Sequence, residues 1–276
     1  MELPGNFRSG YRSSSVVPEY FRRMIKPKQM DFEYAMWQMF HLCVAPRKVF
    51  RNMVYHKHAS DHWARDDPAF VVVSVAFLTI ASLAYGIAFR ASLWAVLKLL
   101  LWSVFVDFVA VGMLVATVGW WVANTFLRSD DGASLEAASN ERLTSLTLGA
   151  DPLYGEFPGG SGPPPAMRSP KVEWLYAFDI HCNAFFPLFV VLYVVQFALL
   201  FLILSNSIVA PLVSNALYVI ATLFYYYITF LGYSELSFLS RTNVFLYPAV
   251  VFVILFTILT LLQYNISAAV FSFYFA

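Results

Sequence analysis

Charged residues and cysteine are both scarce in this sequence. Asp, Glu, Lys and Arg make up 13% of the 276 residues, whereas about 25% is usual in a soluble domain. The chain is therefore not expected to fold as an ordinary water-soluble domain. The two cysteines, Cys43 and Cys182, are too few for a disulfide framework and lack the spacing of a metal site. We expect both to be reduced thiols.

Signatures of catalysis are also missing from the chain. It has no nucleophile elbow, no phosphate-binding loop and no metal-ligand spacing. Asp179 and His181 come nearest to a catalytic pair, but an aspartate just before a histidine at a helix start is more often a cap and its neighbour. The first thirty residues lack the apolar segment of a cleavable signal peptide. We expect no enzymatic activity, no cofactor and no metal.

Hydrophobic residues, at 59% of the chain, dominate what is present. From Ala69 to Phe89 no residue is charged, and about 20 apolar residues cross a bilayer core. Asp67 and Pro68 favour the start of a helix there. The predicted membrane spans are residues 69–89, 99–126, 184–205, 209–231 and 244–262. The fold class is thus predicted to be all-α, a polytopic membrane bundle of five transmembrane helices with a cytosolic N-terminal helical region.

The region before the first span is polar and basic. Residues 1–29 are predicted to be a mostly disordered basic tail, and residues 30–62 to form cytosolic or interfacial helices ahead of the membrane domain of residues 63–276. From Met30 to Val44 apolar residues recur at helical spacing, namely Phe32, Met36, Met39, Phe40 and Cys43. A second, more basic helix is predicted from Pro46 to Lys57.

Two kinds of surface are predicted on this region. Basic side chains suit an anionic lipid surface, and those assigned to it are Arg22, Arg23, Lys48 and Arg51. For the first two the alternative is a solvated linker. The residues expected to face a protein partner are Trp37, Gln38 and His41, with Trp37 as the aromatic anchor. The alternative for Trp37 is that it packs under the first span and only stabilises the fold.

Asp107 is the acidic residue within the second predicted span. The apolar stretch around it already begins at Leu93, so this helix should tilt or begin as an interfacial turn. A carboxylate in mid-span costs several kcal/mol unless it is neutral or paired. Asp107 is therefore either a proton or ion relay or a structural clamp to another helix. Because the predicted spans offer no second acid and no basic partner, the clamp is favoured.

The loops predict the orientation of the chain. Residues 128–170 read as a disordered cytosolic loop, and 11 of the 18 Lys and Arg lie in residues 1–68. The positive-inside rule then places the N-terminus in the cytosol and, after five spans, the C-terminus in the lumen or outside. Asn265 begins a glycosylation sequon on that far side. The predicted interfacial aromatic belt consists of Tyr225, Tyr226 and Tyr227.

Several unusual strings together resemble one protein family. In chain order they are MDFEYAMWQM (30–39), WARDDPAF (63–70), KLLLW (98–102), EWLYAFDIHCNAFFPL (173–188), FLGYS (230–234) and LYP (246–248). Their order and spacing resemble the uncoordinated-fifty (Unc-50) family of Golgi multi-pass membrane proteins, over about residues 28–276. The loop at 128–170 departs from the family pattern, in which this loop is much shorter.

This resemblance implies a Golgi protein of vesicular transport. Its implied partners are the lipid bilayer, an Arf guanine-nucleotide exchange factor and membrane cargo such as nicotinic acetylcholine receptors. An RNA-binding role is also attached to the family, but the sequence offers only a short basic and aromatic stretch for it. Two functions compete: a trafficking adaptor, and a channel, transporter or lipid-moving protein that uses Asp107. A transport path normally needs several facing polar groups, so a nearly lone acid favours the adaptor.

Overall fold

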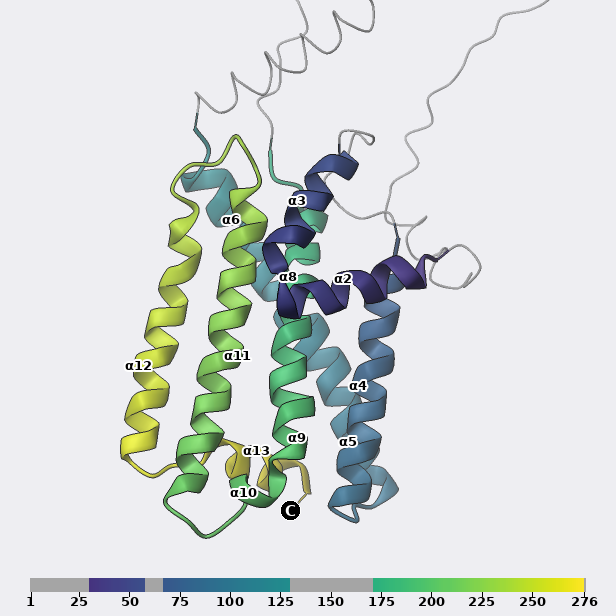
Figure 1. Ribbon diagram of the computed structural model, residues 1–276, viewed down its shortest axis with the longest axis vertical. Helices are drawn as coiled ribbons and strands as arrows, with labels where there is room; N and C mark the ends of the chain where they lie inside the picture. The colour runs from purple at the N-terminus through teal and green to yellow at the C-terminus, as the bar shows by residue number, and fades with distance from the viewer. Residues whose placement is uncertain (1–29, 58–66, 130–170, 276) are drawn as a thin grey trace, which may run out of the picture.

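The computed structural model describes residues 30–57, 67–129 and 171–275 (Figure 1). Within these residues the chain is helical and has no strand. Five helices are long and apolar enough to cross a membrane, namely Ala69–Ala88, Leu93–Phe126, Trp174–Ala198, Val209–Ser234 and Thr242–Leu261. The predicted all-α membrane bundle is therefore confirmed. The basic tail with Arg22 and Arg23, and nearly all of the long loop, lie outside the described residues.

Several of the spans are built from consecutive helical pieces. The elements are, in chain order, α2 (Phe32–Val44), α3 (Pro46–Lys57), α4 (Ala69–Ala88), α5 (Leu93–Leu101), the π-helix η2 (Trp102–Ala110), α6 (Val111–Phe126), α8 (Trp174–Phe189), the π-helix η3 (Val190–Val195), α9 (Gln196–Ala198), α10 (Leu200–Ile203), α11 (Val209–Ser234), the 3₁₀-helix η4 (Thr242–Leu246), α12 (Tyr247–Leu261) and α13 (Ile266–Phe275).

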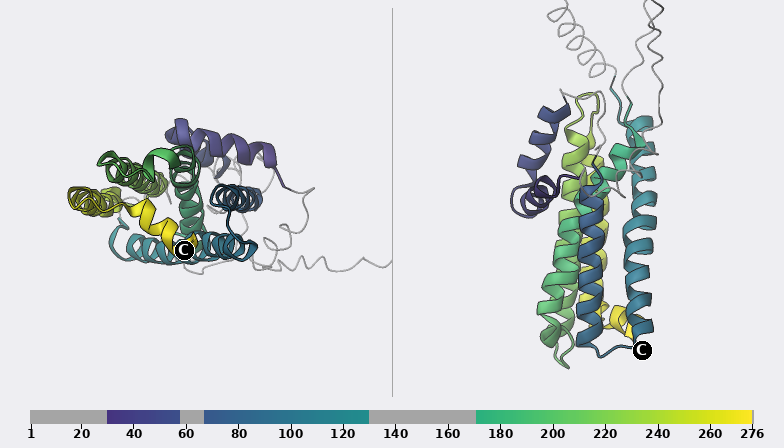
Figure 2. Two further views of the ribbon diagram at one scale, coloured as in Figure 1. Left: turned by 90° about the horizontal axis from the view of Figure 1, so that it is seen from below. Right: turned by 90° about the vertical axis from the view of Figure 1, so that its right-hand side faces the viewer.

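The central helix of the bundle is α8. It packs against α6, α11, α2 and α4, and the view along the bundle in Figure 2 shows it between them. We call the end of the bundle where α3, the start of α4 and the end of α11 lie the α3 end. The α13 end is the opposite end, where α13 folds back beneath the spans (Figure 1).

The third span begins earlier than the sequence predicted. Its helix starts at Trp174 rather than at Ala184, and the polar residues Asp179, His181 and Asn183 are buried within it. Hydropathy placed these residues outside the span because it scores each side chain as if it faced lipid. Here they face other helices of the bundle, where hydrogen bonds can offset the cost of removing them from water.

Small residues let α6 approach α8 closely. The buried residues of α6 are Gly112, Ala116, Gly119 and Ala123, a spacing that lines one helix face. A Cβ at Gly112 would collide with the imidazole of His181 on α8, and a Cβ at Gly119 would collide with the Tyr233 hydroxyl at the end of α11. In lipid, helix association depends on packing rather than on exclusion of water, so small residues at the contact favour it.

The N-terminal helices are part of the bundle rather than a separate arm. The Asp67 carboxylate accepts the backbone N–H of Ala69 at 2.9 Å and that of Asp31 at 2.7 Å. The Asp67 side chain therefore accepts a backbone N–H at the start of α4 and also fixes the start of α2 beside it. Asp31 in turn caps α2 by accepting the N–H of Tyr34 at 2.8 Å. In Figure 1, α2 lies across the spans while α3 rises from its end.

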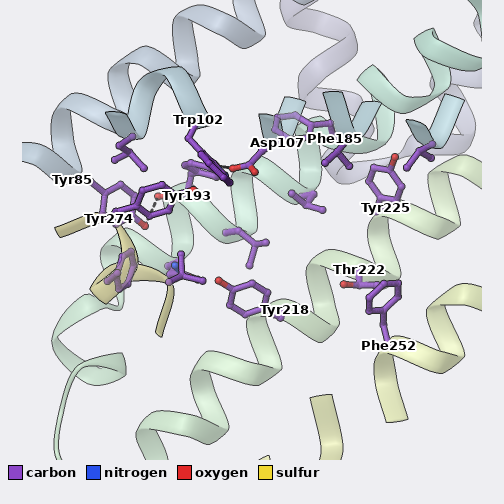
Figure 3. Close-up of a pocket in the computed structure, with 18 of the residues that line it drawn as sticks. Tyr85, Trp102, Asp107, Phe185, Tyr193, Tyr218, Thr222, Tyr225, Phe252 and Tyr274 are labelled. Carbon is purple, nitrogen blue, oxygen red and sulfur yellow. Dashed lines mark hydrogen bonds between the residues drawn. The ribbon is translucent and has the colours of Figure 1, made fainter. Parts of the chain in front are cut away.

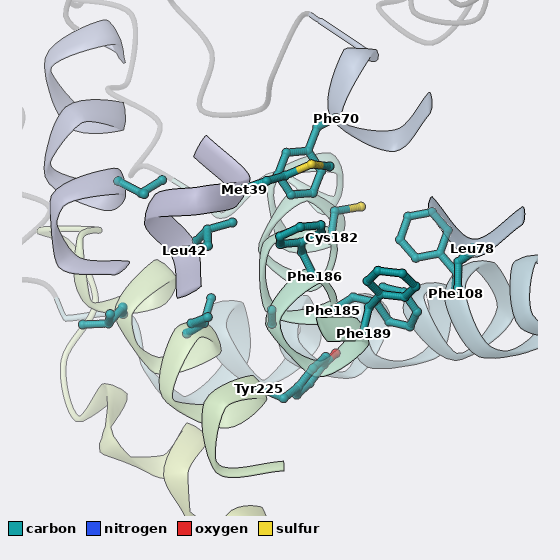
Figure 4. Packing of buried hydrophobic residues seen from close by; sticks show 14 of the residues in the cluster. Met39, Leu42, Phe70, Leu78, Phe108, Cys182, Phe185, Phe186, Phe189 and Tyr225 are labelled. Carbon is teal, nitrogen blue, oxygen red and sulfur yellow. The ribbon is translucent and has the colours of Figure 1, made fainter. Parts of the chain in front are cut away.

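The predicted apolar face of α2 is divided between core and surface. The residues of α2 that are buried are Ala35, Gln38, Met39 and Leu42. Of the residues predicted to form one face, Met39 packs in the main core with aromatic residues of α4, α8 and α11 (Figure 4). Phe32, Met36 and Phe40 are exposed at 39%, 46% and 64%. They form an outward apolar stripe at the level of the first span's start, as expected of a helix resting on the bilayer interface.

The last helix was not predicted, because the sequence after the fifth span reads as an apolar tail. Asn265 begins it by accepting the N–H of Ala268 at 3.0 Å, and its amide donates to the carbonyl of Ile203 at 2.7 Å. The side-chain amide of Asn265 therefore uses both its nitrogen and its oxygen in hydrogen bonds. Buried serines then join α13 to α11, since Ser267 N–H donates to Ser214 Oγ at 3.0 Å.

Candidate functional site

A cavity of about 510 Å³ lies among the spans toward the α13 end (Figure 3). Its walls come from η2, α6, α8, η3, α11 and α12, and α13 contributes Phe271 and Tyr274. Much of the wall is apolar. The polar groups among its lining are chiefly Asp107, His181, Tyr193, Gln196, Tyr218 and Tyr225. A volume in this range suits a small-molecule ligand or part of a larger one.

Asp107 enters the cavity from the π-helix η2. The Tyr193 hydroxyl lies 3.2 Å from Asp107 Oδ2 and 3.2 Å from Ser103 Oγ. A hydroxyl carries one hydrogen, so Tyr193 can donate to Asp107 while it accepts from Ser103. Trp102, on the same π-helix, lies beside this carboxyl (Figure 3). The clamp to another helix is thus present in the form of Tyr193.

His181 forms the wall of the cavity nearest the core. Its Nε2 lies 3.0 Å from the carbonyl oxygen of Phe108, and its Nδ1 lies 2.7 Å from the Tyr225 hydroxyl. A carbonyl can only accept, so Nε2 carries the hydrogen and Nδ1 accepts from Tyr225. Both ring nitrogens are used, which leaves none for Asp179. The geometry does not support a catalytic Asp179–His181 pair.

Tyr225 is also not part of an interfacial belt. It is 7% exposed and faces His181 inside the bundle. Tyr227, two residues later in the chain, accepts a hydrogen bond from Arg47 Nε of α3 at 3.0 Å. The three consecutive tyrosines therefore point to different surroundings, as a helical turn of about 100° per residue requires. The belt was predicted from residue type alone, which does not resolve the faces of a buried helix.

A second polar network closes the cavity at the α13 end. Ser267 Oγ donates to Gln196 Oε1 at 3.2 Å, and Ser214 Oγ donates to Ser267 Oγ at 2.7 Å. All three side chains are buried. Asn215 adds a bond from Nδ2 to the carbonyl of Tyr264 at 2.9 Å. These bonds hold α13 against α9 and α11 and so fix one wall of the cavity.

The expectation that the spans hold one nearly lone polar group was wrong. The described spans also bury Asp179, His181, Asn183, Gln196 and Asn215. A signal for the cavity was present in the sequence of α11, where Tyr218, Thr222 and Tyr225 recur at spacings of four and three. All three line the cavity. A polar stripe at this spacing in an apolar helix indicates a face turned away from lipid.

The second candidate site lies on the surface of α2 and α3. The rings of Trp37 and His41 stack with centroids 4.2 Å apart, and Lys48 Nζ lies 5.6 Å from the Trp37 ring centroid. His41 Nδ1 donates to the carbonyl of Trp37 at 2.8 Å, and Nε2 accepts from Lys48 Nζ at 3.3 Å. The structure therefore brings together Trp37 and His41, predicted for a protein partner, and Lys48, predicted for lipid. We call these three residues the Trp37 cluster.

Gln38 does not belong to this surface, and its assignment to a partner was wrong. It is 1% exposed. Its Nε2 donates to Oδ1 of Asn183 on α8 at 3.5 Å and lies 3.8 Å from the sulfur of Met53. Neighbouring positions on a helix point about 100° apart, so Trp37 and Gln38 cannot share one face. Gln38 joins α2 to the central helix instead.

Arg51 is exposed on α3. Its charge acts on Glu235, just after α11. Burial raises the pKa of the Glu235 carboxyl, and the Arg51 charge works in the opposite direction. On α2, burial raises the pKa of the Cys43 thiol to about 11, which makes it a weak nucleophile at neutral pH. Within the described ranges, no three His, Cys, Asp or Glu side chains cluster as a metal site would require.

The fold and the two sites define a class of protein. It has five helices fit to cross a membrane, an N-terminal helical pair folded onto them, and a cavity between the spans that contains one carboxyl group. No solved structure matches the chain. The model of the UNC-50 family matches residues 20–275.

The chain belongs to the UNC-50 family. It is 45% identical to "Protein unc-50 homolog" of Dictyostelium discoideum over 98% of this chain and 92% of the relative. It is 37% identical to the protein of the same name from Rattus norvegicus, over 93% of this chain and 86% of the relative. "Protein unc-50" of Caenorhabditis elegans is 37% identical over 94% of this chain and 74% of its own length. The family resemblance inferred from the short strings is therefore confirmed.

Proposed function

We propose that this protein is a Golgi membrane adaptor that supports vesicular protein transport without catalysis of its own. It recruits an Arf guanine-nucleotide exchange factor from the cytosol and assists delivery of membrane cargo such as nicotinic receptors to the cell surface. Membership of the UNC-50 family supports this role. The observation that carries the proposal is the Trp37 cluster, an aromatic and basic surface on helices that are fixed to the bundle.

The attachment of α2 and α3 makes this surface suitable for recruitment. Three hydrogen bonds hold the pair, from Asp31 N–H to Asp67, from Gln38 to Asn183 and from Arg47 to Tyr227. A surface that is already ordered loses little conformational freedom on binding. Tryptophan is frequent among the residues that dominate binding energy at interfaces. Lys48, placed over the Trp37 ring, adds a charge that helps to select an acidic partner.

The proposed orientation places the α3 end in the cytosol. The described segments at that end are α3, the end of α6, the start of α8 and the link from α11 to α12 (Figure 1). Their basic residues include Arg47, Lys48, Arg51, Arg128, Lys171 and Arg241. Arg90 and Lys98 belong to the α13 end. This bias supports the orientation that the positive-inside rule predicts, with the C-terminus on the lumenal side. Protease protection of terminal tags tests it, since an N-terminal tag shielded inside intact Golgi vesicles would contradict the orientation.

The adaptor role is tested by capture of the exchange factor. Trp37→Ala is expected to reduce co-purification of an Arf exchange factor by about tenfold or more, as loss of an interface hot spot does. The matched control is Trp94→Ala, the same change at a side chain that is 74% exposed at the α13 end. Both variants are compared at equal protein levels in the Golgi.

A lipid contribution is measured separately with Lys48→Glu/Arg51→Glu. If Lys48 and Arg51 act only through attraction to anionic lipid, that attraction should weaken as salt is added. It should also not discriminate among protein partners. Undiminished capture by folded, Golgi-localised Trp37→Ala would refute this surface as the recruiting site.

A further inference from the structure

The cavity among the spans has a chemistry that the adaptor role does not use. Its lining contains one carboxyl group, that of Asp107, and among the described lining residues there is no Lys or Arg. His181 bonds a hydroxyl and a carbonyl rather than an acid, and as the neutral ring that burial favours it supplies no positive charge. An ionised Asp107 would therefore give the cavity a negative charge without a partner in these walls.

Asp107 also keeps unused capacity for hydrogen bonds. A carboxylate can accept about four, and in the described part of the chain the side chain that donates to it at hydrogen-bond distance is Tyr193. This donor is neutral. The residue lies about 20 Å along the helix from Leu93 at about 1.5 Å per residue, deep within a span. A carboxylate at such a depth is costly to ionise unless a cation accompanies it.

Aromatic side chains share the cavity with this carboxyl. Tyr193 donates to it, Trp102 lies beside it (Figure 3), and Tyr218 and Tyr274 line the same cavity. Figure 3 shows these rings facing one space with Asp107 at its edge. Rings that enclose a carboxylate are the arrangement by which proteins bind organic ammonium groups, since the ring faces attract the cation and tolerate its alkyl substituents.

The rest of the cavity suits an alkyl chain. Its wall continues along apolar side chains of four helices, among them Leu99, Val111, Val115, Leu192 and Phe252. Its walls belong to helices that are long and apolar enough to cross a membrane, so an alkyl chain in it would meet an apolar environment.

We propose that this cavity binds a single-chain lipid amine, with the ammonium group at Asp107 and the alkyl chain along the apolar wall. The proposal goes beyond the adaptor function, because it assigns a ligand to a site that recruitment does not require. A zwitterionic phospholipid fits less well, since its phosphate would meet Asp107 and find no basic side chain among the described lining residues. A neutral alcohol of equal chain length would leave the carboxylate without its cation.

The direct test is photo-crosslinking of the full-length protein in nanodiscs of phosphatidylcholine. Three probes carry the same diazirine in the chain: a tetradecylamine, a tetradecanol and a phosphatidylcholine. We expect the amine to label the protein at residues that line the cavity, and unlabelled tetradecylamine to compete. Preferential labelling by phosphatidylcholine, or equal labelling by the alcohol, would overturn the proposal.

Variants locate the site. Asp107→Asn is expected to reduce amine labelling by about tenfold or more, since the charge partner is lost. Phe105→Leu is the matched control, because Phe105 lies in the same helix and is 60% exposed on its outer side. Undiminished labelling of Asp107→Asn would contradict the proposal.

A second pair of variants keeps the test valid if the first does not fold. Tyr218→Leu removes a ring from the wall, and Tyr218→Phe keeps the ring. The leucine variant is expected to lose about fivefold in amine affinity while the phenylalanine variant retains it, as a cation–π contact requires. Equal affinities of the two variants, each verified as monodisperse, would also contradict the proposal.

Discussion

The two ends of this bundle differ in how fully their buried polar groups are paired. Toward the α3 end they pair with one another across helices, as Gln38 does with Asn183 and as the Tyr176 hydroxyl does with the carbonyl of Gly232 at 2.7 Å. Toward the α13 end Ser214, Ser267 and Gln196 also pair across helices, whereas Asp107 faces a cavity and keeps unused acceptor capacity. Paired groups fix how helices pack, whereas a group with spare capacity is available to a ligand. His181 lies at the boundary between the two regions.

This difference gives a rule for reading substitutions. A change at a packed contact or at a paired buried group should act on the stability of the fold, because it breaks packing or leaves a buried partner without its bond. A change at Asp107 should act on ligand binding and leave the fold nearly intact. Substitutions at four positions test this division, and their expected cost in stability decreases from the first to the last.

Gly112→Leu is expected to have the largest effect. Its side chain would be forced into the His181 ring, and overpacking of this kind costs about 3 kcal/mol. The matched control is Ala110→Leu, at an exposed position on the same continuous helix. Thermal unfolding in detergent measures both. Equal midpoints for the two variants would show that α6 and α8 are not in close contact at this point.

Gln38→Leu is expected to cost about 2 kcal/mol, because it keeps the volume and leaves the buried Asn183 without one of its partners. Trp37→Ala, one residue away at a half-buried position beside His41, should lower the unfolding midpoint less than Gln38→Leu does. Phe40→Leu, exposed on the same helix, is the control. A larger loss of stability for Trp37→Ala than for Gln38→Leu would mean that Trp37 has a structural role instead.

Ser267→Ala should cost about 1 kcal/mol, since it removes a hydroxyl that joins buried Ser214 and Gln196. Ser272→Ala is the control on the same helix, because that hydroxyl bonds the carbonyl of Ala269 within its own turn and is exposed. Hydrogen exchange of α13 provides the measurement. Faster exchange in the control than in Ser267→Ala would contradict the described attachment of α13.

Asp107→Asn is expected to change stability least, by about 0.5 kcal/mol or less, since the amide oxygen still accepts from Tyr193. Asp107→Leu should cost somewhat more, and Asp107→Lys the most of the three, because it introduces a new charge in mid-span. Steady-state levels and detergent stability rank them. A severe loss of folded protein in Asp107→Asn would show that Asp107 is a structural clamp first.

The sequence alone predicted the parts of this fold that depend on long apolar runs. Uncharged stretches of sufficient length and the Asp67–Pro68 junction located the first span, and helical spacing located α2 and α3. Hydropathy failed where polar residues face helices instead of lipid. It placed the start of the third span too late, because Asp179, His181 and Asn183 read as a boundary although they are buried.

The candidate sites were harder to predict for a related reason. A sequence shows that Trp37, Gln38 and His41 are near one another along the chain, but the face of the helix on which each lies depends on the helices that cover it. Gln38 is buried because α8 presents Asn183 to it from a distant part of the chain. The cavity likewise needs η2, α11 and α13 together, and α13 was not recognised as a helix.

The division between the two ends is tested most directly by the thermal shift that tetradecylamine produces in three proteins in nanodiscs. A ligand that binds the folded state raises the unfolding midpoint according to its affinity. Wild type and Gln38→Leu should rise by equal increments, although the variant starts lower. Asp107→Asn should start near wild type and not rise, and tetradecanol should shift none of the three. An equal rise in Asp107→Asn, or no rise in folded Gln38→Leu, would contradict the account.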